Sequence, residues 1–224
     1  MTNPNQNSRK LLAACDKQDL RFMQDRPYCE WDSRLRADLS KKRYDHVIRV
    51  VRTAIVLADR FGVNVEQART AALLHDCAKS NEKTYFDRLL AAGFVKESDW
   101  DPSPVFHAWL GARVAEADYG VTDPVVLEAI ANHTTGSPDM DQVSAITFIA
   151  DLIEPNRDYP SVDEIRSLAW TDLEACLLVS MNRTLAYLIK SDRPIDMRTV
   201  ASRNRLLQKL KMDENDLDFQ SIKG

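Results

Sequence analysis

The chain has 224 residues, 44% of them apolar, and a formal net charge of -4 at pH 7, which suits one well-buried domain with tails. This small charge gives no global field that would attract nucleic acid or anionic lipid, and no stretch is apolar for the roughly 18 to 20 residues that a membrane helix needs. Because the opening segment MTNPNQNSRK also lacks the apolar core of a secretory signal, we expect a globular protein of the cytoplasm with no nucleic-acid or membrane partner.

Composition and helical spacing divide the chain into three parts. We expect a partly mobile N-terminal extension over residues 1–27, a main domain over residues 28–211 and an acidic tail over residues 212–224. No segment shows sustained two-residue alternation or the turn signature of a β-hairpin. The sequence therefore predicts an all-α helical bundle.

The first two helices of the main domain place polar residues in an apolar setting. Apolar side chains recur on one stripe over residues 47–61, and His46 lies at the rim of that stripe. Asn64 is expected to cap the next helix, which is apolar on nearly all sides and contains the adjacent pair His75 and Asp76. A buried charge is unfavourable unless it faces an opposite charge or a metal. The pair therefore indicates an ion inside the bundle.

Later helices add further donors of the same kind. A helix that begins near residue 104 has His107 on its inner face, the next helix ends at His133, and a helix over residues 141–153 has Asp151 in its last turn. All four histidines of the chain thus join two aspartates in one candidate ligand set. The set is His46, His75, Asp76, His107, His133 and Asp151.

The remaining features are interpreted as structural. Ser161 and Thr171, each followed three positions later by glutamate, are expected to cap two further helices, and a last amphipathic helix spans about residues 196–211. We interpret two basic groups, at residues 41–43 and 203–211, as solvated helix surface. The four cysteines form no C-x-x-C motif and are expected to be reduced thiols that pack in the core.

Imidazole and carboxylate donors suit one or two borderline divalent ions, such as Fe, Mn, Co, Ni or Zn, rather than a thiolate-bound structural zinc. Asp76 adjoins a ligand histidine at the buried centre, so we expect it to bridge two ions. Two such ions, about 3.5 to 4 Å apart, would hold a hydroxide that attacks phosphorus near neutral pH. The alternative is a set of core histidines satisfied by hydrogen bonds. Hydrolysis of a phosphoester or phosphoanhydride is the favoured interpretation.

Three more residues are candidates for contacts with phosphate, each with a structural alternative. Lys79 follows Asp76 by three positions and either leans over the metal centre or complements the dipole at the helix end. Arg157 either grips a phosphate or forms an ion pair with Asp158 or Glu164. Thr134 either donates its hydroxyl to phosphate or ends the helix.

These residues resemble a known family. His46, the pair His75-Asp76 with Lys79, and Asp151 look like the H…HD…D signature of the HD phosphohydrolase superfamily. The strings LLHDCAK, NHTTG and FIADLIEPNRDYPSVDEIR are similar, more narrowly, to the YqeK family of symmetrical bis(5'-nucleosyl)-tetraphosphatases. The resemblance covers about residues 40–205 and departs from the family pattern at Leu152 and at Ser161, where a glycine is expected.

The resemblance implies an HD hydrolase domain with a dinuclear centre, in which iron is the expected metal and manganese or cobalt can serve. Its substrate would be the dinucleotide diadenosine tetraphosphate, hydrolysed to two ADP. One ion would be held by His46, His75, Asp76 and Asp151, and the other by Asp76, His107 and His133. Asp76 and Lys79 would be the catalytic residues, while Lys79, Thr134 and Arg157 would bind phosphate oxygens.

Two alternatives stay open at this point. The same metal centre could act on another nucleotide, such as a nucleoside monophosphate, a cyclic dinucleotide or a guanosine alarmone. The domain could also be a nucleotide-sensing module without catalysis. The sequence leaves the oligomeric state open, with a homodimer as one option.

Overall fold

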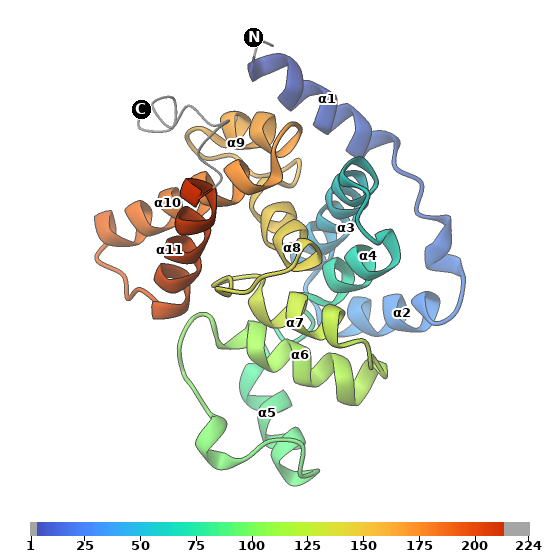
Figure 1. The fold of residues 1–224 in the computed structure, drawn as a ribbon. Helices are drawn as coiled ribbons and strands as arrows, with labels where there is room; N and C mark the ends of the chain where they lie inside the picture. Colours follow the sequence, from blue (N-terminus) through green and yellow to red (C-terminus); the bar gives the residue numbers. More distant parts are fainter. Residues whose placement is uncertain (1–3, 213–224) are drawn as a thin grey trace.

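The structure is a computed structural model that describes residues 4–212, and every regular element in that range is a helix (Figure 1). The α-helices are α1 (Pro4–Lys17), α2 (Tyr28–Asp38), α3 (Lys41–Phe61), α4 (Val65–Leu74), α5 (Glu82–Ala91), α6 (Phe106–Tyr119), α7 (Pro124–Asn132), α8 (Gln142–Ile153), α9 (Val162–Ala169), α10 (Leu173–Lys190) and α11 (Met197–Met212). Two short 3-10 helices are η1 (Arg21–Gln24) and η2 (Glu97–Asp99). The predicted all-α bundle is confirmed for these residues, whereas most of the predicted acidic tail lies outside them.

Four helices, α3, α4, α7 and α8, pack together at the centre of the bundle (Figure 1). Their facing side chains are apolar and fully buried, as for Leu57 of α3, Leu73 of α4 and Ile146 of α8. Helix α6 covers α7, while α9 and α10 pack on α8. Because apolar residues recur at helical spacing on one side of each helix, packing buries those sides together.

Local capping fixes where the central helices begin and end. The Asn64 side chain accepts hydrogen bonds from two amides in the first turn of α4, as predicted. Asp123 caps α7 and Asp141 caps α8 in the same way. Gly62 ends α3 with a left-handed backbone (φ 66°), which a residue without Cβ adopts without strain. These caps set the face that each helix presents to the core.

The start of the chain differs from the prediction. Residues 1–27 were expected to be a partly mobile extension, but α1 packs on α3 and α9. Leu11 is fully buried and Cys15 is 1% exposed. Arg52 of α3 donates a hydrogen bond to the Gln18 carbonyl at 2.8 Å. Only a few apolar side chains anchor this polar helix, so its order depends on partners distant in sequence. The domain boundary at residue 28 stays a prediction.

Substitution of Leu11 by Ala tests whether α1 is part of the core. We expect a loss of about 2 to 5 kcal/mol in the free energy of unfolding, because the shortened side chain leaves a cavity between helices. Urea unfolding monitored by circular dichroism measures it. The exposed neighbour Lys10, changed to Ala, is the control and should alter stability by less than about 0.5 kcal/mol. Equal, small effects in both variants would contradict the packing of α1.

Two predicted helix caps are wrong. Ser161 precedes α9, but its backbone is left-handed (φ 70°) and its side chain makes no capping hydrogen bond. A capping side chain normally requires an extended backbone at that position. Helix α10 is capped by Asp172, whose carboxylate accepts from the Ala175 amide at 2.9 Å, and not by Thr171. The turn before α9 therefore demands a conformation that glycine adopts best.

Substitution of Ser161 by Gly should stabilise the protein. A left-handed backbone costs a residue with Cβ roughly 1 to 2 kcal/mol, part of which is offset by the greater freedom of glycine in the unfolded chain. We expect a net gain of up to about 1 kcal/mol in urea unfolding. Ser161→Ala keeps the Cβ and should give no gain. A loss of stability in the glycine variant would show that the Ser161 side chain is needed here.

Candidate metal centre

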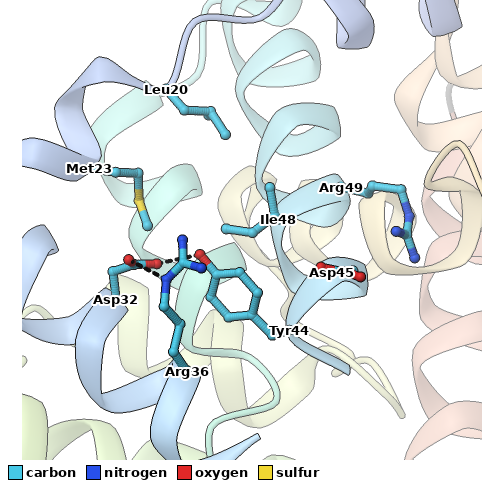
Figure 2. A pocket seen from close by; sticks show the side chains of 8 residues that line it. All are labelled: Leu20, Met23, Asp32, Arg36, Tyr44, Asp45, Ile48 and Arg49. Carbon is cyan, nitrogen blue, oxygen red and sulfur yellow. Dashed lines mark hydrogen bonds and ion pairs between the residues drawn. The ribbon is translucent and has the colours of Figure 1, made fainter. Parts of the chain in front are cut away.

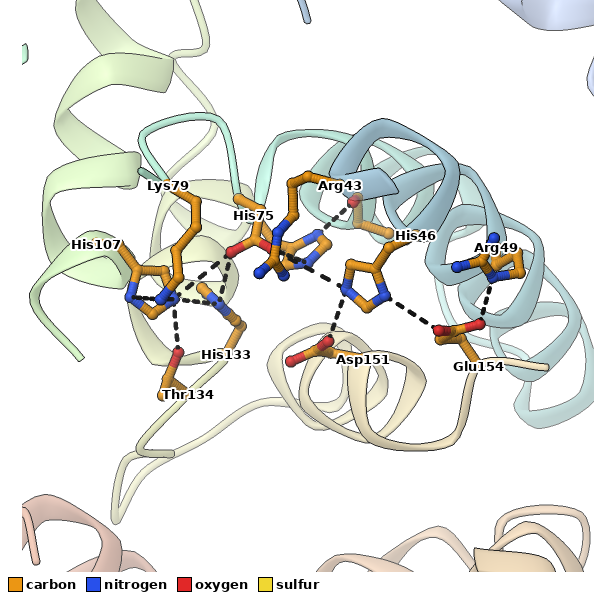
Figure 3. A network of polar contacts seen from close by, with 12 residues as sticks. Arg43, His46, Arg49, His75, Lys79, His107, His133, Thr134, Asp151 and Glu154 are labelled. Carbon is orange, nitrogen blue, oxygen red and sulfur yellow. Dashed lines mark hydrogen bonds and ion pairs between the residues drawn. The ribbon is translucent and has the colours of Figure 1, made fainter. Parts of the chain in front are cut away.

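The six residues of the candidate ligand set come together between five helices, and Figure 3 labels all of them except Asp76. They lie near the start of α3 (His46), at and just after the end of α4 (His75, Asp76), near the start of α6 (His107), after the end of α7 (His133) and in the last turn of α8 (Asp151). Sequence analysis placed His75 and Asp76 inside a helix, but α4 ends at Leu74. The set is thus built largely from helix ends, where side chains and loops can converge.

Three of the histidines are oriented by the backbone. Nδ1 of His75 lies 2.7 Å from the Ala72 carbonyl, and Nδ1 of His133 lies 2.8 Å from the Ile130 carbonyl. His107 makes the same contact with the Pro104 carbonyl at 3.0 Å. A carbonyl can only accept, so Nδ1 of His75 and Nδ1 of His133 carry a proton and donate it, whereas Nδ1 of His107 also lies 2.8 Å from Nζ of Lys79. In all three rings Nε2 is the nitrogen that faces the carboxylate of Asp76.

His46 is oriented by a carboxylate instead. Its Nδ1 lies 3.2 Å from Oε1 of Glu154, and its Nε2 lies 3.0 Å from Oδ1 of Asp151. Burial raises the pKa of Glu154, but the hydrogen bonds from His46 and Arg49 outweigh it and lower the pKa to about 2. Glu154 is therefore ionised and accepts the proton of His46 Nδ1.

The carboxylate of Asp76, 2% exposed, lies at the middle of the set. Its Oδ2 is 3.4 Å from Nε2 of His75 and 4.0 Å from Nε2 of His46. Its Oδ1 is 3.6 Å from Nε2 of His107 and 3.8 Å from Nε2 of His133. Each oxygen thus faces a different pair of histidines, which is the arrangement expected of a carboxylate that bridges two positions.

The residues have the chemistry that a divalent metal requires. Nε2 of His46 and Nε2 of His75 are buried and make no hydrogen bond within the described part of the chain, although carboxylate oxygens of Asp151 and Asp76 lie 3.0 and 3.4 Å from them. Three overlapping groups have ligand atoms within 4.8 Å of one another: His46, His75 and Asp76; His75, His133 and Asp151; and Asp76, His107 and His133. Buried nitrogens without partners are rare because they are costly. A cation among them would satisfy both the nitrogens and the carboxylates.

The charge states of the candidate ligands also favour metal binding. Burial lowers the pKa of His107 to about 3 and that of His133 to about 4, so both rings are neutral at pH 7 and can donate lone pairs. Burial raises the pKa of Asp151, but His46, His75 and Arg157 outweigh it and hold that pKa well below its usual range. Burial lowers the pKa of His75, but Asp76 and Asp151 outweigh it and raise that pKa. The centre therefore combines the neutral imidazoles of His107 and His133 with ionised carboxylates.

The three predicted phosphate-binding residues border the centre at two ends. Nζ of Lys79 lies 2.8 Å from Nδ1 and 3.3 Å from Nε2 of His107, and the Thr134 hydroxyl lies 3.3 Å from the same Nε2. Arg157 lies at the other end, where it donates to Oδ1 of Asp151 at 2.5 Å and to the Asp151 carbonyl at 2.8 Å.

The structural alternative that named Asp158 or Glu164 as the partner of Arg157 is therefore wrong. Arg157 pairs with Asp151, and Glu164 pairs with Arg183 at 2.6 Å.

Sequence analysis missed two groups at the centre. Arg43 was interpreted as solvated surface, but Nη1 lies 2.8 Å from Oδ2 of Asp76 and the side chain is 35% exposed. Glu154 was not assigned a role. Both lie three positions from a candidate ligand on the same stretch of chain, Arg43 before His46 and Glu154 after Asp151. This spacing places side chains on one helix face and could have identified them.

The cysteines and the cavity beside α3 lie apart from this set. The four cysteines are free, as expected, and Cys77 contacts the Gly111 carbonyl at 3.4 Å in the core. A cavity of about 400 Å³ lies between η1, α2 and α3 (Figure 2). It is lined by Leu20, Met23, Asp32, Arg36, Tyr44, Asp45, Ile48 and Arg49, none of which belongs to the candidate ligand set.

A helical bundle with a buried His-Asp pair, surrounded by further His and Asp donors, defines a metal-dependent hydrolase of the HD type. Residues 43–156 match the HD domain family. The chain belongs to this family and, within it, to the group of the symmetrical bis(5'-nucleosyl)-tetraphosphatases. The resemblance inferred from the sequence motifs is therefore confirmed.

Several relatives place the chain in this group. A symmetrical bis(5'-nucleosyl)-tetraphosphatase of Bacillus subtilis (strain 168) is 37% identical over 174 residues, which are 77% of this chain and 94% of that protein. The Staphylococcus aureus (strain NCTC 8325 / PS 47) protein of the same name is 34% identical and covers 72% of this chain and 85% of its own length.

A solved structure agrees with the fold. The crystal structure of a predicted HD superfamily hydrolase involved in NAD metabolism from Clostridium acetobutylicum is 32% identical, with a TM-score of 0.72. It covers 81% of this chain and 97% of that chain. Among the described residues, no helix is long and apolar enough to cross a membrane.

Metal binding should stabilise the protein through Asp76. With Mn²⁺ at about 100 times its dissociation constant, we expect a gain of about 2.7 kcal/mol over the metal-free protein, seen as a rise in Tm by scanning calorimetry. Asp76→Asn should remove most of this gain because it removes the charge that faces all four imidazoles. Asp45→Asn, which changes a carboxylate paired with Lys41 on α3, should retain it. An unchanged gain in Asp76→Asn would contradict metal binding at this centre.

Proposed function

We propose that this protein hydrolyses diadenosine tetraphosphate, and related dinucleoside tetraphosphates, symmetrically to give two ADP. The main observation in support is the position of Asp76, whose two carboxylate oxygens face two different pairs of histidines. The relatives named symmetrical bis(5'-nucleosyl)-tetraphosphatase match most of this chain and most of their own length, which favours the same substrate class here.

The proposal includes two divalent ions, with iron as the expected metal and manganese or cobalt as substitutes. One position is assigned to His46, His75, Asp76 and Asp151, and the other to Asp76, His107 and His133. Two of the three groups of converging donors support this division, while the third, which joins His75, His133 and Asp151, indicates that the two positions are adjacent. When bound, such ions supply an acidified water as nucleophile and neutralise charge on phosphorus.

The protein's own cations are arranged for a substrate with phosphates on both sides of the scissile bond. Lys79 and Thr134 lie beside His107, whereas Arg157 lies beside Asp151 at the opposite end of the centre. We assign these three residues to phosphate oxygens on either side of the central P–O–P bridge. Arg43, paired with Asp76, joins them as a further donor at the half-exposed edge of the centre. A symmetrical tetraphosphate would contact the phosphate-binding candidates at both ends of the centre at once.

The alternatives drawn from the sequence have less support. A mononucleotide would engage the cations of one end only, and a purely sensing module would not need donors arranged around a shared carboxylate. The absence of nucleic-acid partners, the oligomeric state and the cytoplasmic location stay predictions of the sequence.

Product analysis after incubation with diadenosine tetraphosphate tests the proposal. The protein is reconstituted anaerobically with Fe²⁺ or Mn²⁺, and the products are separated by anion exchange. We expect ADP as the sole product. Asp76→Ala should lower kcat/KM by about 10³-fold or more, because loss of both metal positions removes several kcal/mol of transition-state stabilisation.

Three other results of this experiment would contradict the proposed reaction. AMP together with ATP would contradict symmetrical cleavage. Release of inorganic phosphate from a nucleoside monophosphate, without turnover of the dinucleotide, would favour another substrate. Binding of nucleotide without turnover in any metal would favour a sensing module.

A further inference from the structure

Glu154 is a buried carboxylate with no place in the candidate ligand set. It follows the last residue of α8 and is 3% exposed. Oε1 faces Nδ1 of His46 at 3.2 Å, while Oε2 accepts from Nε of Arg49 at 2.6 Å and from the Asn156 amide at 2.7 Å. A buried charge must be paired and hydrogen-bonded to be tolerated, and both oxygens of Glu154 are engaged.

This contact makes His46 different from the other three histidines. In those rings Nδ1 faces a neutral backbone carbonyl. Nδ1 of His46 instead donates to the carboxylate of Glu154, as Figure 3 shows. A carboxylate partner fixes the tautomer and ring orientation of a ligating imidazole and raises its basicity. His46 is therefore expected to be the strongest donor of the four.

The effect of Glu154 is confined to one end of the centre. His46 belongs to the group with His75 and Asp76, and its Nε2 also lies 3.0 Å from Asp151. It takes no part in the group formed by Asp76, His107 and His133. The His46 end thus has two carboxylates, Asp76 paired with Arg43 and Asp151 paired with Arg157, and Glu154 lies behind the imidazole. The His107 end has Asp76 alone, with the ammonium of Lys79 nearby.

We propose that Glu154 is a positioning residue that orients His46 and makes the His46 end the tighter of two unequal metal positions. This inference rests on the dinuclear centre of the proposed function. Metal would fill the His46 end first, and the His107 end, which has one carboxylate in place of two and lies next to Lys79, would bind its ion more weakly.

The surrounding structure holds Glu154 in place from two sides. Arg49 lies one turn after His46 on α3, so the same helix provides the imidazole and the counter-charge. Arg166 of α9 is 5% exposed and donates to the carbonyls of Ile153 and Glu154 at 3.0 and 2.9 Å. The backbone of Glu154 is thus fixed independently of its carboxylate. A substitution that preserves side-chain size should therefore leave the loop in place.

Calorimetric titration of the metal-free full chain with Mn²⁺ under anaerobic conditions tests the proposal, together with metal counting after dialysis. The wild-type protein should bind two ions in two separable steps. In Glu154→Gln the side chain keeps its size and loses its charge. Its tighter step should weaken by about 10- to 100-fold, as for other carboxylates that orient ligating histidines, while the weaker step is unchanged. Glu164→Gln, at an exposed carboxylate paired with Arg183, is the matched control and should leave both steps unchanged.

The outcomes separate a positioning role from a structural one. Equal weakening of both steps, or no change in either, would overturn the proposal. If Glu154→Gln does not fold by circular dichroism, Arg49→Gln replaces it, because that variant leaves the contact with His46 and removes only the charge behind it. It should weaken the tighter step alone, and an effect on the other step would overturn the proposal.

Failure of the proposed function gives a different result. A wild-type protein that binds a single ion would contradict the dinuclear centre and the two unequal positions. A lower affinity for that single ion in Glu154→Gln would still identify Glu154 as the residue that orients His46. Two ions bound in two steps without hydrolysis of diadenosine tetraphosphate would contradict the substrate and leave the inference on Glu154 standing.

Discussion

The burial of the Asp76 carboxylate is the constraint on which the rest of the centre depends. A charge that is 2% exposed must be balanced, and here four imidazoles and the guanidinium of Arg43 surround it. Burial raises the pKa of Asp76, but His75, His133 and Arg43 outweigh it and hold the pKa well below its usual range. These groups come from four helices, α3, α4, α6 and α7, or from the residues that directly follow them, and the packing of these helices positions the donors that a cation would bind.

The ends of helices orient the candidate ligands and also connect them to loops at the edge of the centre. His75 and His133 follow the last residues of α4 and α7, where a backbone carbonyl three positions earlier orients each ring. The loops that continue from these ends provide Lys79 and Thr134. Candidate metal ligands inside the bundle and candidate phosphate contacts at its edge thus come from the same short segments. This is a geometry that a helix interior could not provide.

The N-terminal helix is connected to the centre through α9. Ser8 of α1 donates to Asp163 at 2.8 Å, and Asp163 pairs with Arg166 at 3.0 Å. Arg166 in turn donates to the carbonyls of Glu154 and Arg157, each at 2.9 Å. The loop that provides one candidate phosphate contact and the partner of His46 is therefore braced by a helix that sequence analysis assigned to a mobile extension.

The sequence by itself determined the helical class and the candidate ligand set, because helical spacing and the scarcity of histidine are local properties that can be counted. It also predicted the N-cap of α4 and the end of α3. Only the tertiary structure decided that Arg43 pairs with Asp76, 33 positions away, and that Glu154 orients His46 across 108 positions. The packing of α1 and the left-handed turn at Ser161 were likewise decided only by the tertiary structure. Each depends on which surfaces meet after folding, and a surface charge and a buried ion pair look the same in sequence until the partner is placed.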